Sequence, residues 1–169
     1  MRRASTLLNA SPHLQTALRV LGALLLLFVG LDHYYEYSAQ SYSVIPTIGT
    51  LFLLNFISAT AIGVLLLAPL ERITGRFGLL AVRVAAVSGF AIASSSLLAL
   101  LVSEQTKLFG FMESNYRPAI LVAIASEAAA AVVLALVALS TAPESAQMHG
   151  PAHDRSPGPA DEQRVGPAC

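Results

Sequence analysis

The sequence has 169 residues, of which 55% are hydrophobic and only 12% are charged. Because soluble domains carry about 25% charged residues, this composition and a mean hydropathy of +0.66 argue against a soluble domain and indicate a membrane protein. The formal net charge is zero and there is no basic stripe, which argues against a nucleic-acid partner.

A polar segment, residues 1–16, precedes four apolar segments at residues 17–37, 50–70, 78–102 and 119–139. Each has the roughly 20 residues that a helix rising ~1.5 Å per residue needs to cross ~30 Å of hydrocarbon. Unpaired backbone groups are costly in that layer, so the segments are expected to be helical. The sequence therefore predicts an all-α polytopic membrane protein, an up-and-down bundle of four transmembrane helices within residues 17–140 that contacts the lipid bilayer directly.

The last segment, residues 141–169, is rich in proline, glycine and alanine, carries mixed charge and has no aromatic residue. Such a segment buries too little apolar surface to offset its ordering entropy, so we expect a disordered tail.

Positive charges predict the orientation of the bundle. They gather before the first apolar segment and around the link between the second and third: Arg2, Arg3, Arg19, Arg72, Arg76 and Arg83. The positive-inside rule therefore predicts cytoplasmic N and C termini in a multi-pass protein of the plasma (inner) membrane. Residues 30–49 and 104–118 then lie on the outer side. Arg19 and Arg83 are expected to reach toward the headgroups at the inner helix ends.

Asp32, His33 and Glu36 form a polar cluster at the outer end of the first helix. At ~100° per residue they share one broad face if the helix continues that far. Carboxylate and imidazole groups are a partial ligand set for a metal ion at the outer face, which needs further ligands such as Glu104 or Glu113. The alternative is a solvated helix end in which His33 bonds to a neighbouring carboxylate.

Four tyrosines accompany this cluster, Tyr34, Tyr35, Tyr37 and Tyr42. Tyrosines at a membrane boundary are typical of an interfacial aromatic belt. A pocket for a quinone or another aromatic ligand is the alternative interpretation.

Glu127 lies near the middle of the fourth apolar segment, among alanine and valine. A carboxylate at that depth is costly, so it should face the bundle and find a partner or stay protonated. Asn55 in the second segment and the serines of the third are candidate partners. The sequence leaves two interpretations open, a proton-relay or ligand-binding carboxylate and a protonated carboxyl that only holds helices together.

The strings GLDHYYEY, IPTIGTLFLLN and LFGFMESNYRPAILVAIASEAAA resemble those of small four-helix membrane proteins from actinobacteria, and more loosely of the DoxX-like membrane proteins. The resemblance covers about residues 17–140. It implies that His33, Asn55 and Glu127 are the residues that matter most.

Small size, short loops and small-residue helix faces favour a non-enzymatic accessory or assembly subunit of an envelope or redox membrane complex. Its partner would be another membrane protein or a second copy of the chain. One alternative is a small proton-coupled transporter that uses Glu127. Another is a metal-linked redox membrane protein that uses His33.

Overall fold

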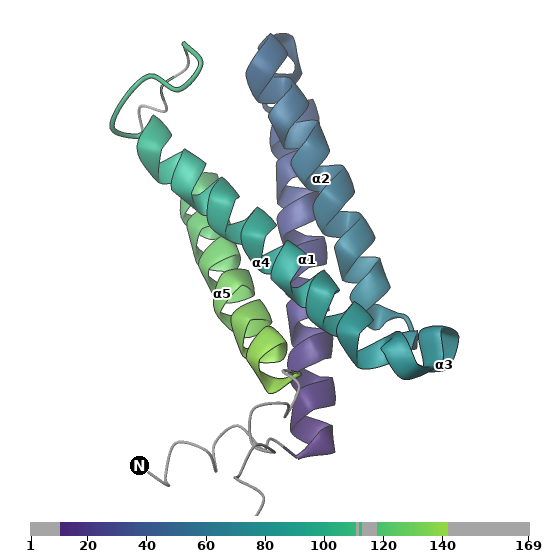
Figure 1. Cartoon of the computed structure of the whole chain (residues 1–169). Coiled ribbons are helices and arrows are strands. Elements are labelled where there is room, and N and C mark those ends of the chain that lie inside the picture. The colour runs from purple at the N-terminus through teal and green to yellow at the C-terminus, as the bar shows by residue number, and fades with distance from the viewer. Residues whose placement is uncertain (1–10, 111, 113–117, 142–169) are drawn as a thin grey trace, which may run out of the picture.

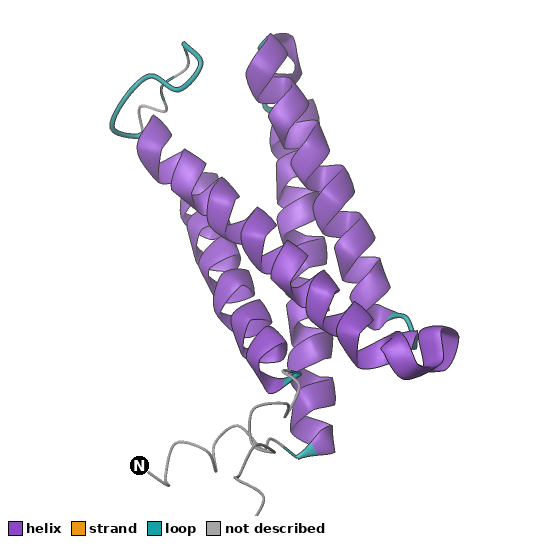
Figure 2. Cartoon of the chain, in the orientation of Figure 1, coloured by secondary structure: helices purple, strands orange, loops and turns teal. Residues whose placement is uncertain are grey.

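The computed structural model describes residues 11–110, 112 and 118–141 of the chain. Four long helices make up most of this part: α1 (Pro12–Ala39), α2 (Pro46–Leu67), α4 (Gly78–Ser103) and α5 (Pro118–Ser140). Each is long and apolar enough to cross a membrane, and Figure 2 shows no strand in the described part. The prediction of an all-α, multi-pass membrane protein is confirmed, whereas most of the predicted tail lies outside the described residues.

The helix bounds differ from the predicted ranges at the ends. The first helix begins at Pro12 rather than residue 17, because the Ser11 side chain accepts a hydrogen bond from the Leu14 backbone N–H at 3.4 Å and caps the helix. The second begins at Pro46 rather than residue 50, since proline is favoured at a first helical position. It ends at Leu67 rather than residue 70, ahead of Pro69.

Three short helices occupy the links that hydropathy alone left without structure. They are η1 (Tyr42–Val44) between α1 and α2, and α3 (Leu70–Thr74) and η2 (Gly75–Phe77) between α2 and α4. We call the end of the bundle that carries α3 the α3 end and the opposite one the η1 end.

The four long helices alternate in direction along the bundle (Figure 1). Helix α1 packs mainly against α2 and α5, and α4 packs against α5 and α2. Helix α4 runs obliquely, from beside α2 at the α3 end to the top of α5, so the α1–α2 pair and the α4–α5 pair spread apart toward the η1 end (Figure 1). The predicted up-and-down bundle is therefore observed.

The middle of the bundle is closely packed where α4 crosses α1 and α5. Leu26 of α1 and Leu134 of α5 are fully buried there. A Cβ atom on Gly89 of α4 would lie 2.7 Å from Leu26 Cδ1 and 3.1 Å from Leu134 Cδ1. A larger residue here would force Leu26 or Leu134 to shift, and such close approach through a small residue is expected for helices that associate in lipid. This crossing fills the middle of the bundle.

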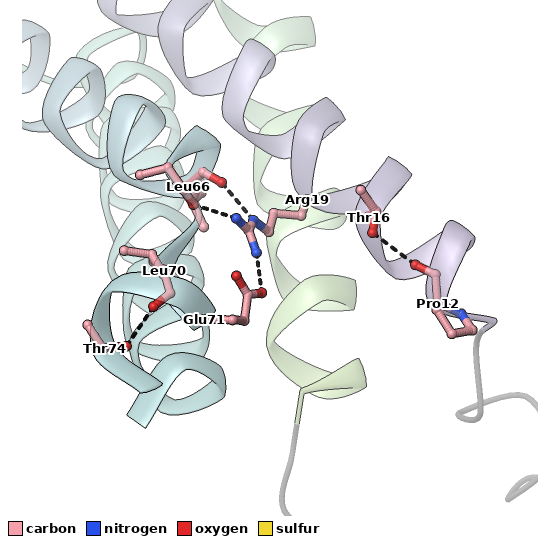
Figure 3. A network of polar contacts seen from close by, with 8 residues as sticks. Pro12, Thr16, Arg19, Leu66, Leu70, Glu71 and Thr74 are labelled. Atoms are coloured by element: carbon pink, nitrogen blue, oxygen red, sulfur yellow. Dashed lines mark hydrogen bonds and ion pairs between the residues drawn. The ribbon is translucent and has the colours of Figure 1, made fainter. Parts of the chain in front are cut away.

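Arg19 fastens the α3 end from within. Its Nε donates a hydrogen bond to the Leu66 carbonyl oxygen at 2.7 Å, a second guanidinium nitrogen donates to the Ala68 carbonyl at 2.5 Å, and a third pairs with Glu71. Figure 3 shows the guanidinium group of Arg19, which belongs to α1, lying between the end of α2 and α3. The last carbonyls of a helix lack partners within it, so Arg19 satisfies them. Its predicted approach to the headgroups is replaced by these inward bonds.

Candidate functional site

A cavity of about 310 Å³ lies between the helices in the half of the bundle toward the η1 end. All four long helices and η1 contribute to its walls. Most of the lining is apolar, and the polar side chains on it come from α1, α2, α4 and α5: Asp32, His33, Glu36, Asn55, Ser95, Ser96, Ser103 and Glu127. The structure thus brings together in one cavity Glu127, Asn55 and the polar cluster of α1, which the sequence indicated separately.

His33 is buried, with 7% of its surface exposed, which excludes the solvated helix end considered from the sequence. Its Nδ1 lies 2.9 Å from the Val29 carbonyl oxygen, one turn back along α1. A carbonyl oxygen only accepts, so Nδ1 carries the hydrogen and Nε2 is the acceptor of the neutral ring. Nε2 lies 2.9 Å from the hydroxyl oxygen of Ser96 on α4, which can donate to it. The ring is therefore held in one orientation between α1 and α4.

Glu127 of α5 is 1% exposed and faces His33. Its Oε1 lies 3.6 Å from His33 Nε2, and Ser96 interacts with the same carboxyl group. Its Oε2 has no hydrogen-bond partner among the described residues. Glu127, His33 and Ser96 therefore form a polar contact between three helices, in which a carboxyl group and an imidazole, the two groups able to take up a proton, lie 3.6 Å apart.

Asn55 of α2 lines the same cavity but is not the partner of Glu127 for which the sequence made it a candidate. Its side-chain oxygen is buried and has no hydrogen-bond partner within the described part of the chain. Of the predicted partners, a serine of α4 takes that place instead. Asn55 therefore offers a buried acceptor to whatever enters the cavity.

Asp32 and Glu36 lie on the cavity wall formed by α1, and Glu36 is 6% exposed. With His33 they were the predicted ligands of a metal ion. Across the described residues, no group of three or more His, Cys, Asp or Glu side chains is placed to hold a metal ion. Both nitrogens of His33 are engaged by Val29 and Ser96, and Glu113 lies outside the described part. The metal site stays a prediction without a ligand set in this structure.

The tyrosines divide into an exposed group and a buried residue, and Tyr37 of α1 is intermediate between them. Tyr34 and Tyr35 are 46% and 50% exposed, as expected for an aromatic belt. Tyr42 of η1 is 8% exposed, stacks on Phe52 of α2 with ring centroids 5.0 Å apart, and lines the cavity. Phe52 also lies against the His33 ring at 5.2 Å. The cavity therefore has an aromatic wall directly beside its polar groups.

Sequence reasoning missed that His33 and Glu127 lie side by side, although their depths carried a signal. His33 precedes the end of α1 by six residues and Glu127 follows the start of α5 by nine. At ~1.5 Å per residue both lie about 9–14 Å from the η1 end. Asn55 and Ser96 lie at similar depths, nine residues into α2 and seven before the end of α4. These four residues can meet because they lie at similar depths on four helices of the same bundle.

No family model, curated protein or solved structure matches the chain. The resemblance to DoxX-like and actinobacterial four-helix proteins therefore stays a prediction.

Proposed function

We propose that the protein is a small proton-coupled carrier, with the cavity as its binding site and Glu127 as the carboxyl group that exchanges a proton for cargo. The observation that carries this proposal is the placement of Glu127: it is 1% exposed, 3.6 Å from His33 Nε2, and its second oxygen has no partner among the described residues. A carboxyl group that only held helices together would have both oxygens bonded to its neighbours.

The surroundings of Glu127 favour a pair that holds one proton. Losing that proton leaves a negative charge, and gaining a second leaves a positive one, and either is costly in an apolar interior. The other titratable groups on the cavity wall are Asp32, Glu36 and Tyr42, and the described lining contains no lysine or arginine. A positively charged group entering the cavity therefore competes directly with the proton of the Glu127–His33 pair.

One half of the bundle is open and the other is closed, as in a carrier whose binding site is accessible from one side of the membrane. The cavity occupies the half toward the η1 end, whereas Leu26, Gly89 and Leu134 fill the crossing below it. At the other end, Arg19 ties α1 to the C-terminal end of α2 through the Leu66 and Ala68 carbonyls. Transport requires this crossing to open while the cavity closes, a rearrangement typical of carriers.

We further propose that the α3 end is cytoplasmic. The arginines in the described part of the chain lie at or near that end: Arg19, Arg72, Arg76 and Arg83. By the positive-inside rule this supports cytoplasmic termini in the plasma membrane and a cavity that faces outward.

The test is proton movement in liposomes that contain the purified protein and a trapped pH indicator. Three compounds of similar size and different charge serve as cargo: phenyltrimethylammonium, benzyl alcohol and benzenesulfonate. We expect a gradient of at least one to drive proton movement that Glu127→Gln abolishes. Glu71→Gln makes the same chemical change at the α3 end, outside the cavity, and should leave it intact. Equal proton movement in Glu127→Gln liposomes would refute the proposal.

The accessory-subunit hypothesis remains as a second prediction. An assembly role requires no cavity with buried polar groups on its wall, so the cavity favours the carrier. Purification in mild detergent separates the two, because an accessory subunit should retain a stoichiometric membrane-protein partner and a carrier should not. The redox hypothesis built on His33 depends on a metal ion, for which the described residues supply no ligand set.

A further inference from the structure

We infer that the cavity binds a small organic cation with an apolar, preferably aromatic, body. This inference deepens the proposed function by naming the class of cargo, but it concerns binding and can be tested without transport.

The charge of the cavity selects against anions. Among the described residues that line it are three carboxyl groups, of Asp32, Glu36 and Glu127, with one imidazole and no lysine or arginine. These acidic groups can balance an entering cation by losing a proton, but no lining group among the described residues carries a permanent positive charge that could balance an anion. An anionic ligand would meet repulsion in a low-dielectric site where screening is weak.

Two buried oxygens point to a ligand that brings positive charge. Glu127 Oε2 and the Asn55 side-chain oxygen are enclosed, line the cavity and have no hydrogen-bond partner among the described residues. Buried polar atoms of folded proteins nearly always have partners. Both of these atoms are acceptors, from different helices, so their natural complement is a donor or a cation between α2 and α5.

The apolar walls favour an organic cation over a bare inorganic one. Hard metal ions require six or more oxygen ligands, and the described residues contain no group that could hold one. The cavity is instead walled by aliphatic and aromatic side chains, including the stacked Tyr42 and Phe52 at 5.0 Å. Aromatic faces attract organic cations. A volume of about 310 Å³ is at the lower end of the ~300–1,000 Å³ typical of ligand pockets, so the cation is small.

Binding is balanced by the loss of a proton. The entering cation brings one positive charge, and the proton shared by Glu127 and His33 leaves to solvent, so the net charge of the cavity is unchanged. No other bond is made or broken.

The experiment is calorimetric titration of the purified full-length protein in mild detergent with phenyltrimethylammonium, benzyl alcohol and benzenesulfonate. We expect the cation to bind to one site per chain, the neutral compound to bind roughly tenfold more weakly or worse, and the anion not to bind. Glu127→Gln should weaken cation binding by roughly tenfold or more, because an uncompensated charge interaction is lost. Glu127→Asp should retain part of it, and Glu71→Gln all of it.

Circular dichroism and gel filtration of each variant serve as controls, because they show whether weaker binding results from loss of folding. The inference is overturned if the neutral compound or the anion binds as tightly as the cation, or if folded Glu127→Gln binds the cation as well as the wild type does. Cation binding without Glu127-dependent proton movement in liposomes would uphold this inference and refute the carrier. Glu127-dependent proton movement driven only by the neutral compound or the anion would uphold the carrier and refute this inference.

Discussion

Gly89→Ala tests the close packing that separates the cavity from the α3 end. The added methyl carbon would lie 2.7 Å from Leu26 Cδ1 and 3.1 Å from Leu134 Cδ1. Apolar carbons prefer about 3.5–4.0 Å, so Leu26 would have to retreat by roughly 1 Å. Leu26 and Leu134 have no exposed surface, so a retreat moves them against buried neighbours rather than into the surroundings of the bundle. Overpacking of this kind costs about 1–3 kcal/mol.

Helix propensity acts in the opposite direction. Alanine is more favourable than glycine within a helix by about 1 kcal/mol, so we expect a net loss of roughly 0–2 kcal/mol in the wild-type background. In a Leu26→Ala background the nearest clashing atom is gone, and the same Gly89→Ala change should become neutral or stabilising. The coupling between the two sites should therefore be about 1–3 kcal/mol, larger than the scatter found for independent sites.

The assay is reversible unfolding in mixed micelles, monitored by circular dichroism. It compares the wild type, Gly89→Ala, Leu26→Ala and the double variant. It yields a double-mutant cycle with Leu26→Ala as one side. The reasoning is refuted if Gly89→Ala has the same effect in both backgrounds, because the glycine would then not be required by Leu26.

Three further predictions concern the clamp at the α3 end and the polar cluster. Arg19→Met should lower the free energy of unfolding by about 1–3 kcal/mol, since hydrogen bonds from a charged donor to the α2 carbonyls are lost; Glu71→Gln should cost under about 1 kcal/mol, because that carboxylate is 48% exposed. Equal losses of unfolding free energy in the two variants would contradict the view that Arg19 stabilises the α3 end through its bonds to the carbonyl groups. Nitrogen NMR of labelled His33 should show a neutral ring protonated on Nδ1, and the other tautomer would contradict its bond to the backbone. Elemental analysis of untagged protein should find no stoichiometric metal that His33→Ala removes; such a metal would restore the ligand set of Asp32, His33 and Glu36.

The transmembrane helices could be predicted from the sequence because long apolar runs have few alternatives in a bilayer. Their ends were less accurate, since Ser11, Pro12 and Pro46 act through local capping that hydropathy does not register. The short helix α3 was missed for a related reason. Its five residues are too few for an apolar period to appear.

The site was predicted in parts. Glu127 and His33 stand out in the sequence because ionisable residues are rare in membrane segments. Their contact depends on how α1 and α5 are rotated about their axes and on the oblique path of α4. Neither can be predicted from the composition of the helices. Ser96 was indistinguishable from the other small residues of its helix. Tyr42 was grouped with the belt tyrosines because only the fold of η1 turns it inward.

The most direct test of the central claim is a count of protons. Phenyltrimethylammonium is added to the detergent-solubilised protein in weakly buffered solution, and the pH change is calibrated against added acid. Wild-type protein should release about one proton per chain as the cation binds, because the cation displaces the proton of the Glu127–His33 pair and leaves the net charge of the cavity unchanged. Glu127→Gln should release none. Cation binding without proton release, or the same release from Glu127→Gln, would contradict the exchange of a proton for cargo at Glu127.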